Sequence, residues 1–216
     1  MTRPTPLGSA GVNARVAVFV SGSGTTLQSL LDHPITGPWI ALVVADRSGI
    51  KALERARAAG VPTFVVDWAE HSDRGSFGRA IHDVLVAQSI EFVALAGFMR
   101  ILPSELVRSF QGRILNTHPA LLPSFPGAHP VRDTLAWGVK VSGATVHLVD
   151  DEVDHGPIVL QEAVEVMGDD DEESLHRRIR EVEHRLYSEA LRMLVEGRLK
   201  VEGRRVHVLD GNGDPR

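Results

Sequence analysis

Short apolar runs alternate with helical patterns along the first 116 residues of the chain. The runs at 15–20, 40–46, 63–67, 91–97 and 113–116 are predicted as strands. Their nearly continuous apolar character is typical of strands that are buried on both faces. Helical spacing follows Ser21, returns at 50–60, where Gly60 marks the end, and returns again at 77–88. Strands that alternate with helices predict an α/β fold with a doubly wound, mostly parallel sheet.

The pattern changes after Pro119. Four prolines between residues 119 and 130 predict an ordered loop. Two extended segments, 141–150 and 157–167, are joined by an acidic connection and predict an antiparallel extension of the sheet. Residues 174–197 have the spacing of a long amphipathic helix, and residues 199–210 suggest a final short hairpin.

The chain shows no repeat, no low-complexity tract and no linker that would divide it. We therefore expect a single domain over residues 14–209, with a flexible N-terminal extension at 1–13 and a flexible tail at 210–216. There is no signal peptide and no apolar run of membrane-spanning length, so a cytoplasmic protein without a membrane partner is expected.

Composition and charge exclude several classes of function. The net charge of −5 gives no electrostatic footprint for nucleic acid. The chain has no cysteine, which excludes disulfides and thiolate zinc sites. His129, His147 and His155 lack the spacing of metal ligands, so no catalytic metal is expected. A homodimer is compatible with the sequence.

A glycine-containing loop, Ser21-Gly22-Ser23-Gly24-Thr25-Thr26, follows the first predicted strand and opens a helix. Such a loop brings backbone amides, hydroxyls and a helix N terminus close to an anion, and a phosphomonoester fits better than a pyrophosphate. The dinucleotide fingerprint fails at Leu27, although Asp46 lies about twenty residues further on, as that fingerprint requires. A tight turn without a ligand is the alternative.

Asn116 and His118 end the fifth predicted strand, where side chains two residues apart point to the same side. An amide and an imidazole in that position can stabilise an oxyanion that develops on a carbonyl group. Asp154 is the candidate carboxylate to orient the imidazole and favour its charged form. No cysteine or GxSxG serine accompanies them, so direct transfer is favoured over a covalent acyl-enzyme. The alternative is that the three residues are loop caps and ordinary polar side chains.

These residues resemble a known family. The segments SGSGTTLQSLL, LAGFMRIL, RILNTHPALLPSFPG and SGATVHLVDDEVDHGPIVLQ, with REVEH in the late helix, resemble the folate-dependent phosphoribosylglycinamide formyltransferases of purine biosynthesis. The resemblance covers residues 14 to 202 and implies a Rossmann-like formyltransferase fold. It also implies two small-molecule substrates, glycinamide ribonucleotide and 10-formyltetrahydrofolate as the co-substrate.

The resemblance also implies roles for individual residues. Asn116 and His118 would polarise the formyl oxygen, with Asp154 tuning His118, while the substrate amine attacks directly. The residues implied to hold the ribonucleotide are Gly22, Ser23, Gly24, Thr25, Thr26 and Glu183. The residues implied to hold the folate are Arg74, Met99, Arg100, Ile101, Leu102, Asn116, Asp150, Asp151, Glu152, Val153 and Asp154.

The chain departs from the family pattern at Ala120, Pro130, Val131 and His155. His155 stands beside Asp154 and is expected to compete for its carboxylate. Related activities stay open as alternatives: a formyltetrahydrofolate hydrolase, or another folate-dependent formyltransferase such as the tRNA enzyme, which the net charge and length oppose. A nicotinamide oxidoreductase and a non-catalytic binding module are the more distant alternatives.

Overall fold

The computed structural model describes residues 13–210 and residue 214. Apart from Asn13, Asp210 and Asp214, the predicted N-terminal extension (1–13) and tail (210–216) lie outside the described residues. Within residues 13–210, no helix is both long and apolar enough to cross a membrane.

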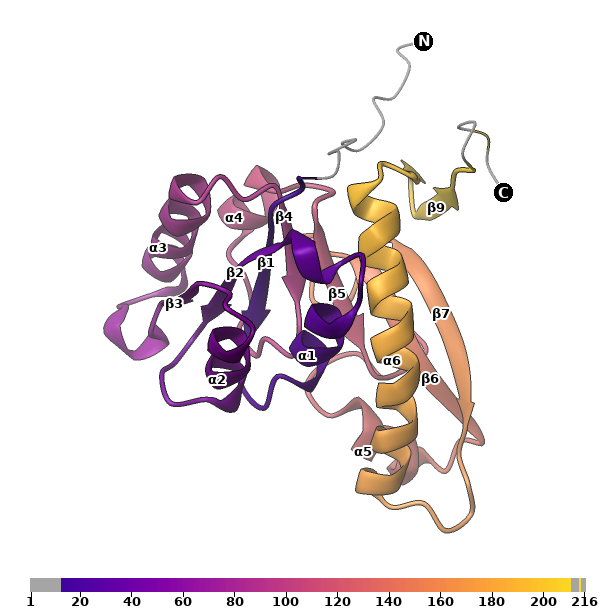
Figure 1. The fold of residues 1–216 in the computed structure, drawn as a ribbon. Coiled ribbons are helices and arrows are strands. Elements are labelled where there is room, and N and C mark those ends of the chain that lie inside the picture. The colour runs from indigo at the N-terminus through magenta and orange to yellow at the C-terminus, as the bar shows by residue number, and fades with distance from the viewer. Residues whose placement is uncertain (1–12, 211–213, 215–216) are drawn as a thin grey trace.

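A seven-stranded sheet with the order β3-β2-β1-β4-β5-β6-β7 forms the centre of the fold (Figure 1). The first five strands are parallel, β6 is antiparallel to β5, and β7 is antiparallel to β6. This confirms the predicted doubly wound sheet with an antiparallel extension. The strands are β1 Val16–Val20, β2 Ile40–Ala45, β3 Thr63–Val65, β4 Phe92–Leu95, β5 Ile114–His118, β6 Val141–Leu148 and β7 Ile158–Glu165.

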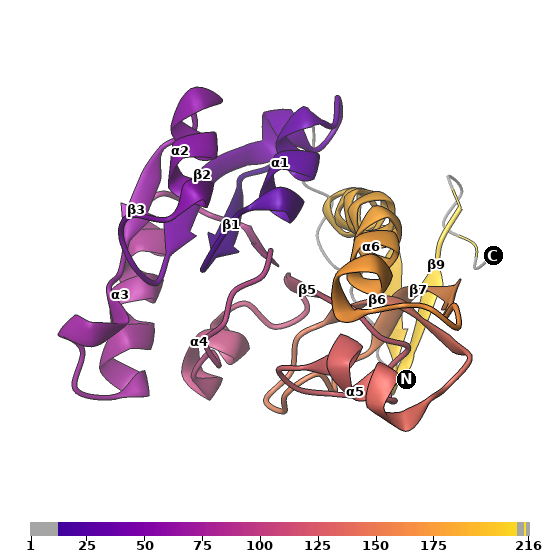
Figure 2. The same cartoon turned by 90° about the horizontal axis from the view of Figure 1, so that it is seen from below.

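Helices cover both faces of the sheet (Figure 2). One face packs against α1 Thr25–Asp32, α2 Lys51–Ala58 and α6 Glu172–Val195, and the other packs against α3 Arg74–Ala87 and α4 Ser104–Ser109. In β1, Val16, Val18 and Val20 face the first helix layer, while Ala17 and Phe19 face the second. All five side chains of β1 are therefore buried, which explains its unbroken apolar sequence.

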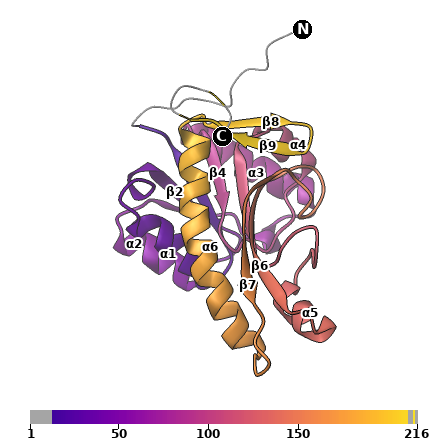
Figure 3. The ribbon, with the colours of Figure 1, turned by 90° about the vertical axis from the view of Figure 1, so that its right-hand side faces the viewer.

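Some short elements were not predicted from the sequence. They are α4, the two 3-10 helices η1 Gly37–Trp39 and η2 Trp68–Glu70, and α5 Pro130–Trp137. The predicted loop at 119–130 ends where α5 begins, because Pro130 occupies the start of this helix. Proline is well tolerated there, since its missing N–H would have no partner within the helix. The predicted final hairpin is confirmed as β8 Leu199–Glu202 and β9 Arg205–Val208, at one end of α6 (Figure 3).

The long helix α6 is fixed to the central strands β4 and β5. The buried hydroxyl of Tyr187 lies 2.9 Å from the carbonyl oxygen of Leu95 in β4 and 3.0 Å from that of Leu115 in β5. Glu183 lies one helical turn earlier, on the same face of α6. The anchored helix therefore holds Glu183 at the carboxyl end of β5.

Candidate active site at the carboxyl ends of the strands

A cavity of about 730 Å³ opens where the strand order reverses between β1 and β4. Ligands of doubly wound sheets bind at such a point, outside the carboxyl ends of the strands. The predicted site residues that line it are Gly22, Ser23, Gly24, Thr25, Thr26, Met99, Arg100, Ile101, Leu102, Asn116, His118, Asp150, Asp151, Glu152, Val153, Asp154 and Glu183. Arg74, at the start of α3, is not among the lining residues.

The glycine loop is held against the second helix. The Ala52 amide donates a hydrogen bond to the Gly22 carbonyl at 3.1 Å, and Nε of Arg55 donates to the Ser23 carbonyl at 2.9 Å. Gly24 has a φ of +71°, and a Cβ there would lie 2.6 Å from Cβ of Ala52. Gly24 precedes α1, whose first turn has no side-chain cap, so its backbone amides are free to bind an anion.

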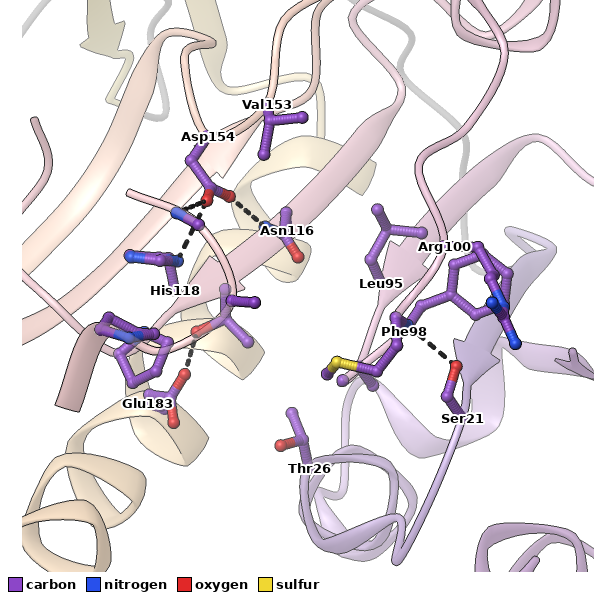
Figure 4. A pocket seen from close by; sticks show the side chains of 18 of the residues that line it. Ser21, Thr26, Leu95, Phe98, Arg100, Asn116, His118, Val153, Asp154 and Glu183 are labelled. Carbon is purple, nitrogen blue, oxygen red and sulfur yellow. Dashed lines mark hydrogen bonds and ion pairs between the residues drawn. The ribbon is translucent and has the colours of Figure 1, made fainter. Parts of the chain in front are cut away.

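Asp154 joins Asn116 and His118 on the opposite side of the cavity (Figure 4). Oδ1 of Asp154 accepts a hydrogen bond of 3.4 Å from Nδ2 of Asn116, and Oδ2 lies 3.5 Å from Nδ1 of His118. The backbone amide of Gly127 also donates to Oδ2, at 2.8 Å. The sequence analysis predicts that these three side chains lie together, and the structure brings them into contact.

Two further features fix this group. Nε2 of His118 donates a hydrogen bond of 2.8 Å to the carbonyl oxygen of Phe125, so Nδ1 is the nitrogen that faces Asp154. Asp154 itself has a φ of +52°, in the left-handed region that residues with a Cβ rarely adopt. Backbone strain of this kind persists where the surrounding structure holds it, and it is often found at functional sites.

His147 is a member of the site that the sequence considered only as a metal ligand. Nδ1 of His147 donates to the carbonyl oxygen of Leu148 at 2.9 Å, so Nε2 accepts from Nδ2 of Asn116 at 3.1 Å. Burial lowers the pKa of His147, which keeps the ring neutral and preserves this arrangement. Its signal was its place on the predicted strand 141–150, but the pairing of His147 with Asn116 depends on the strand register.

Glu183 is buried in the wall of the cavity beside Thr117, a residue to which the sequence gave no role. Oγ1 of Thr117 donates a hydrogen bond of 2.9 Å to Oε1 of Glu183. Burial raises the pKa of Glu183 to about 7, although the Thr117 hydroxyl and the charge of Arg180 work in the opposite direction. Near neutral pH this carboxyl group therefore exists in both protonation states.

Apolar side chains are exposed around the cavity. Met99 is 67% exposed, Ile101 is 53% exposed and Val153 is 53% exposed, although all three line it. Exposed apolar groups that gather at a concave surface indicate a ligand with an apolar face. The side chain of Arg100 instead binds Asp46, with Nε at 2.7 Å from Oδ2.

One expectation about the acidic loop was wrong. His155 does not compete for Asp154, because its Nδ1 lies 2.7 Å from Oδ2 of Asp150. Arg204, in the turn between β8 and β9, donates to the ring and the carbonyl oxygen of His155 and holds it away from Asp154. Within residues 13–210, no group of three or more His, Asp or Glu side chains could hold a metal ion.

Comparison with known proteins adds independent evidence. The model of the formyl transferase family matches residues 14–191. The chain is 48% identical to a phosphoribosylglycinamide formyltransferase of Mycobacterium tuberculosis, over 90% of this chain and 94% of that protein. It is 44% identical to the trifunctional purine biosynthetic protein adenosine-3 of Gallus gallus, over 87% of this chain, but it spans only 19% of that longer protein.

A solved structure agrees with these sequence relationships. The crystal structure of glycinamide ribonucleotide transformylase 1 from Symbiobacterium toebii superimposes with a TM-score of 0.89 at 47% identity, covering 93% of this chain and 96% of that one. The match to the family model, the identity to relatives and the shared fold lead to one conclusion. The chain belongs to the formyl transferase family.

Proposed function

We propose that the protein transfers the formyl group of 10-formyltetrahydrofolate to the amine of glycinamide ribonucleotide, a step of purine biosynthesis. The observation that carries this proposal is the contact of one carboxylate, Asp154, with both Asn116 and His118 in the wall of a cavity. The glycine loop lines the opposite side of the same cavity, so one ligand can bind its anionic group at the loop and present another group to the three residues (Figure 4). The names of the relatives support the choice of substrates.

The ribonucleotide would occupy the side formed by the glycine loop and α6. Its phosphate would bind the backbone amides of Gly22–Thr26 at the start of α1, where the helix dipole favours negative charge. Its ribose hydroxyls would donate to the carboxylate of Glu183. Both contacts would hold the ribonucleotide in place while its amine reacts at the three residues.

The folate would occupy the side formed by segment 99–102 and loop 150–154. Met99, Ile101 and Val153 would cover the apolar faces of the pterin and benzoyl rings, and this contact removes their exposed surface from water. Backbone groups of Arg100 and Leu102 and of loop 150–154 would bind the polar edges of the pterin. Arg74 has no place in this proposal, because it does not line the cavity.

Attack of the amine on the formyl carbon places negative charge on the formyl oxygen. The hydrogen bond from Nδ2 of Asn116 to Asp154 is long, at 3.4 Å, and therefore weak. The hydrogen of this bond is the one that Asn116 can donate to the oxyanion instead. His118 would donate beside it from Nδ1, the ring nitrogen that faces Asp154. The bond between the formyl carbon and N10 of the folate then breaks, and N10 gains a proton while the attacking amine loses one, with Asp154 and a bound water as the relay.

The folate carries the formyl group at the oxidation level of the product, so the transfer requires no redox cofactor. We place the reaction within a single domain, residues 14–209, and in the cytoplasm, where purines are made. A homodimer stays a prediction.

The test is a direct assay of transfer. The protein is mixed with glycinamide ribonucleotide and 10-formyltetrahydrofolate, and the spectrum of the folate product is followed while formylated ribonucleotide is detected by mass spectrometry. We expect both products in equal amounts. Formate release in reactions that lack the ribonucleotide would indicate the hydrolase, and binding of both ligands without turnover would indicate a binding module.

A further inference from the structure

Asp46 is a buried carboxylate outside the catalytic group, at the end of β2. Its side chain is 0% exposed, and Oδ2 lies 2.7 Å from Nε of Arg100 and 3.3 Å from Nη2 of Arg47. The side chain of Ser21 is also hydrogen-bonded to it. Burial alone would raise the pKa of Asp46, but the hydrogen bonds from Arg47, Arg100 and Ser21 outweigh burial and hold the pKa below its ordinary value. Asp46 is therefore a fixed negative charge.

Two of the groups bound to Asp46 belong to two neighbouring segments that line the cavity. Ser21 is the first residue after β1 and directly precedes the glycine loop Gly22–Thr26. Arg100 lies in segment 99–102, on the side where the folate is proposed to bind, and its guanidinium lies 5.2 Å from the centroid of the Trp68 ring. Asp46 thus binds the root of one loop and the side chain of the other.

A direct hydrogen bond also joins these two segments. The backbone amide of Met99 donates to Oγ of Ser21 at 2.9 Å (Figure 4). Because the Ser21 hydroxyl accepts from Met99, its single proton is available for Asp46. A hydrogen-bonded chain therefore runs from Met99 through Ser21 to Asp46 and returns to the neighbouring residue, Arg100.

We propose that Asp46 is a positioning residue that couples the two substrate subsites, so that binding of the ribonucleotide at the glycine loop raises the affinity of segment 99–102 for the folate. This inference rests on the proposed function. Any shift of the glycine loop that turns Ser21 changes the position of the Met99 amide and of Arg100. A buried carboxylate resists such shifts strongly, because loss of one of its hydrogen bonds leaves charge without compensation.

Coupling of this kind is reciprocal and can be measured without catalysis. The affinity for glycinamide ribonucleotide is measured by calorimetry in the absence and presence of saturating tetrahydrofolate, which carries no formyl group to transfer. For the unaltered protein we expect the ribonucleotide to bind about 5-fold or more tightly when tetrahydrofolate is present, which is the lower range of typical coupling factors.

Three variants separate the proposed chain from simple charge loss. Asp46→Asn removes the central charge. Ser21→Ala removes the hydroxyl that accepts from the Met99 amide, and it leaves the ion pair of Asp46 with Arg100 in place. Both should reduce the coupling factor toward 1 and raise KM for the folate while kcat changes less than KM. Arg47→Gln is the matched control, because it removes an ion pair from the same carboxylate but Arg47 belongs to neither loop. It should retain the coupling factor of the unaltered protein.

The outcomes distinguish the two proposals. Absence of ribonucleotide binding or of formyl transfer in the unaltered protein would overturn the proposed function. Normal transfer with a coupling factor of 1 in the unaltered protein, or with full coupling in Ser21→Ala, would overturn the role of Asp46 alone. If Asp46→Asn fails to fold, Ser21→Ala and Arg47→Gln still decide the question.

Discussion

Asn116 donates a hydrogen bond of 3.1 Å to Nε2 of His147, whose Nδ1 donates to the carbonyl oxygen of Leu148. A neutral imidazole has one donor and one acceptor nitrogen, so the bond to Leu148 leaves Nε2 as an acceptor. The amide of Asn116 must therefore direct its nitrogen, and not its oxygen, toward His147. The same nitrogen faces Asp154, which puts a donor where the oxyanion is proposed to form.

Removal of the acceptor on His147 should reduce turnover without preventing binding. In His147→Phe the ring volume is kept, but the Asn116 amide is free to rotate and present its oxygen. We expect kcat to fall by about 10-fold to 100-fold, less than the loss of an oxyanion donor itself, with smaller changes in KM. His147→Gln, which restores an acceptor, should recover part of the activity. Unchanged kcat in His147→Phe would show that the bond has no catalytic value.

Substitution of Asp154 or His118 should reduce turnover strongly. Asp154→Asn removes the negative charge beside His118, and His118→Ala removes the imidazole donor. Each should lower kcat by about 100-fold or more, because these interactions strengthen as the oxyanion forms. Calorimetry with glycinamide ribonucleotide should still show binding, since the glycine loop is unchanged. Near-normal turnover in both variants would contradict the proposed mechanism.

Much of the fold could be predicted from the apolar pattern. The sequence of β1 is apolar at every position because both of its faces are covered, and this signal is local. The signals that end a helix at Gly60 and the alternation of strands and helices at Pro119 are local as well. The start of α5 was missed, because Pro130 has the same appearance in a loop and at the beginning of a helix.

The candidate site was predictable where a strand end positions its residues. Asn116 and His118 share a face because they are two residues apart on β5, and the structure confirms that they meet Asp154. The contact with His147 depends on the register of β5 against β6, and the role of Asp46 depends on the order of β2, β1 and β4. Such relationships between distant segments have no local signal.

Gly24 should tolerate no side chain. Its φ of +71° is strained for alanine, and the new Cβ would meet Cβ of Ala52 at 2.6 Å and Cα of Ala52 at 2.8 Å. Gly24→Ala should lower the free energy of unfolding by about 1–3 kcal/mol and weaken ribonucleotide binding. Gly22→Ala is the control for stability, because nothing lies within 4 Å of a Cβ at that position. Equal midpoints of denaturant unfolding for the two variants would contradict the packing argument.

Glu183 should make stability depend on pH. Its pKa is about 7 in the folded protein against an ordinary value of 4.5, so between these values the folded protein binds more protons than the unfolded chain. Stability therefore falls as the pH rises from 4.5 toward 7, and the loss persists above 7. Glu183→Gln stays neutral and should be more stable than the unaltered protein by about 3 kcal/mol at pH 8, with a gap of about 1 kcal/mol at pH 5.

The same substitution should harm function, because an amide is a weaker acceptor for ribose hydroxyls than a carboxylate. We expect KM for the ribonucleotide to rise by about 10-fold in Glu183→Gln, in line with the loss of a charged hydrogen bond. Urea unfolding at pH 5 and pH 8 measures the stability of both proteins, and steady-state kinetics at pH 8 measures KM. A stability difference that does not grow with pH would contradict the burial of an ionisable Glu183, while an unchanged KM would remove its contact with the ribose.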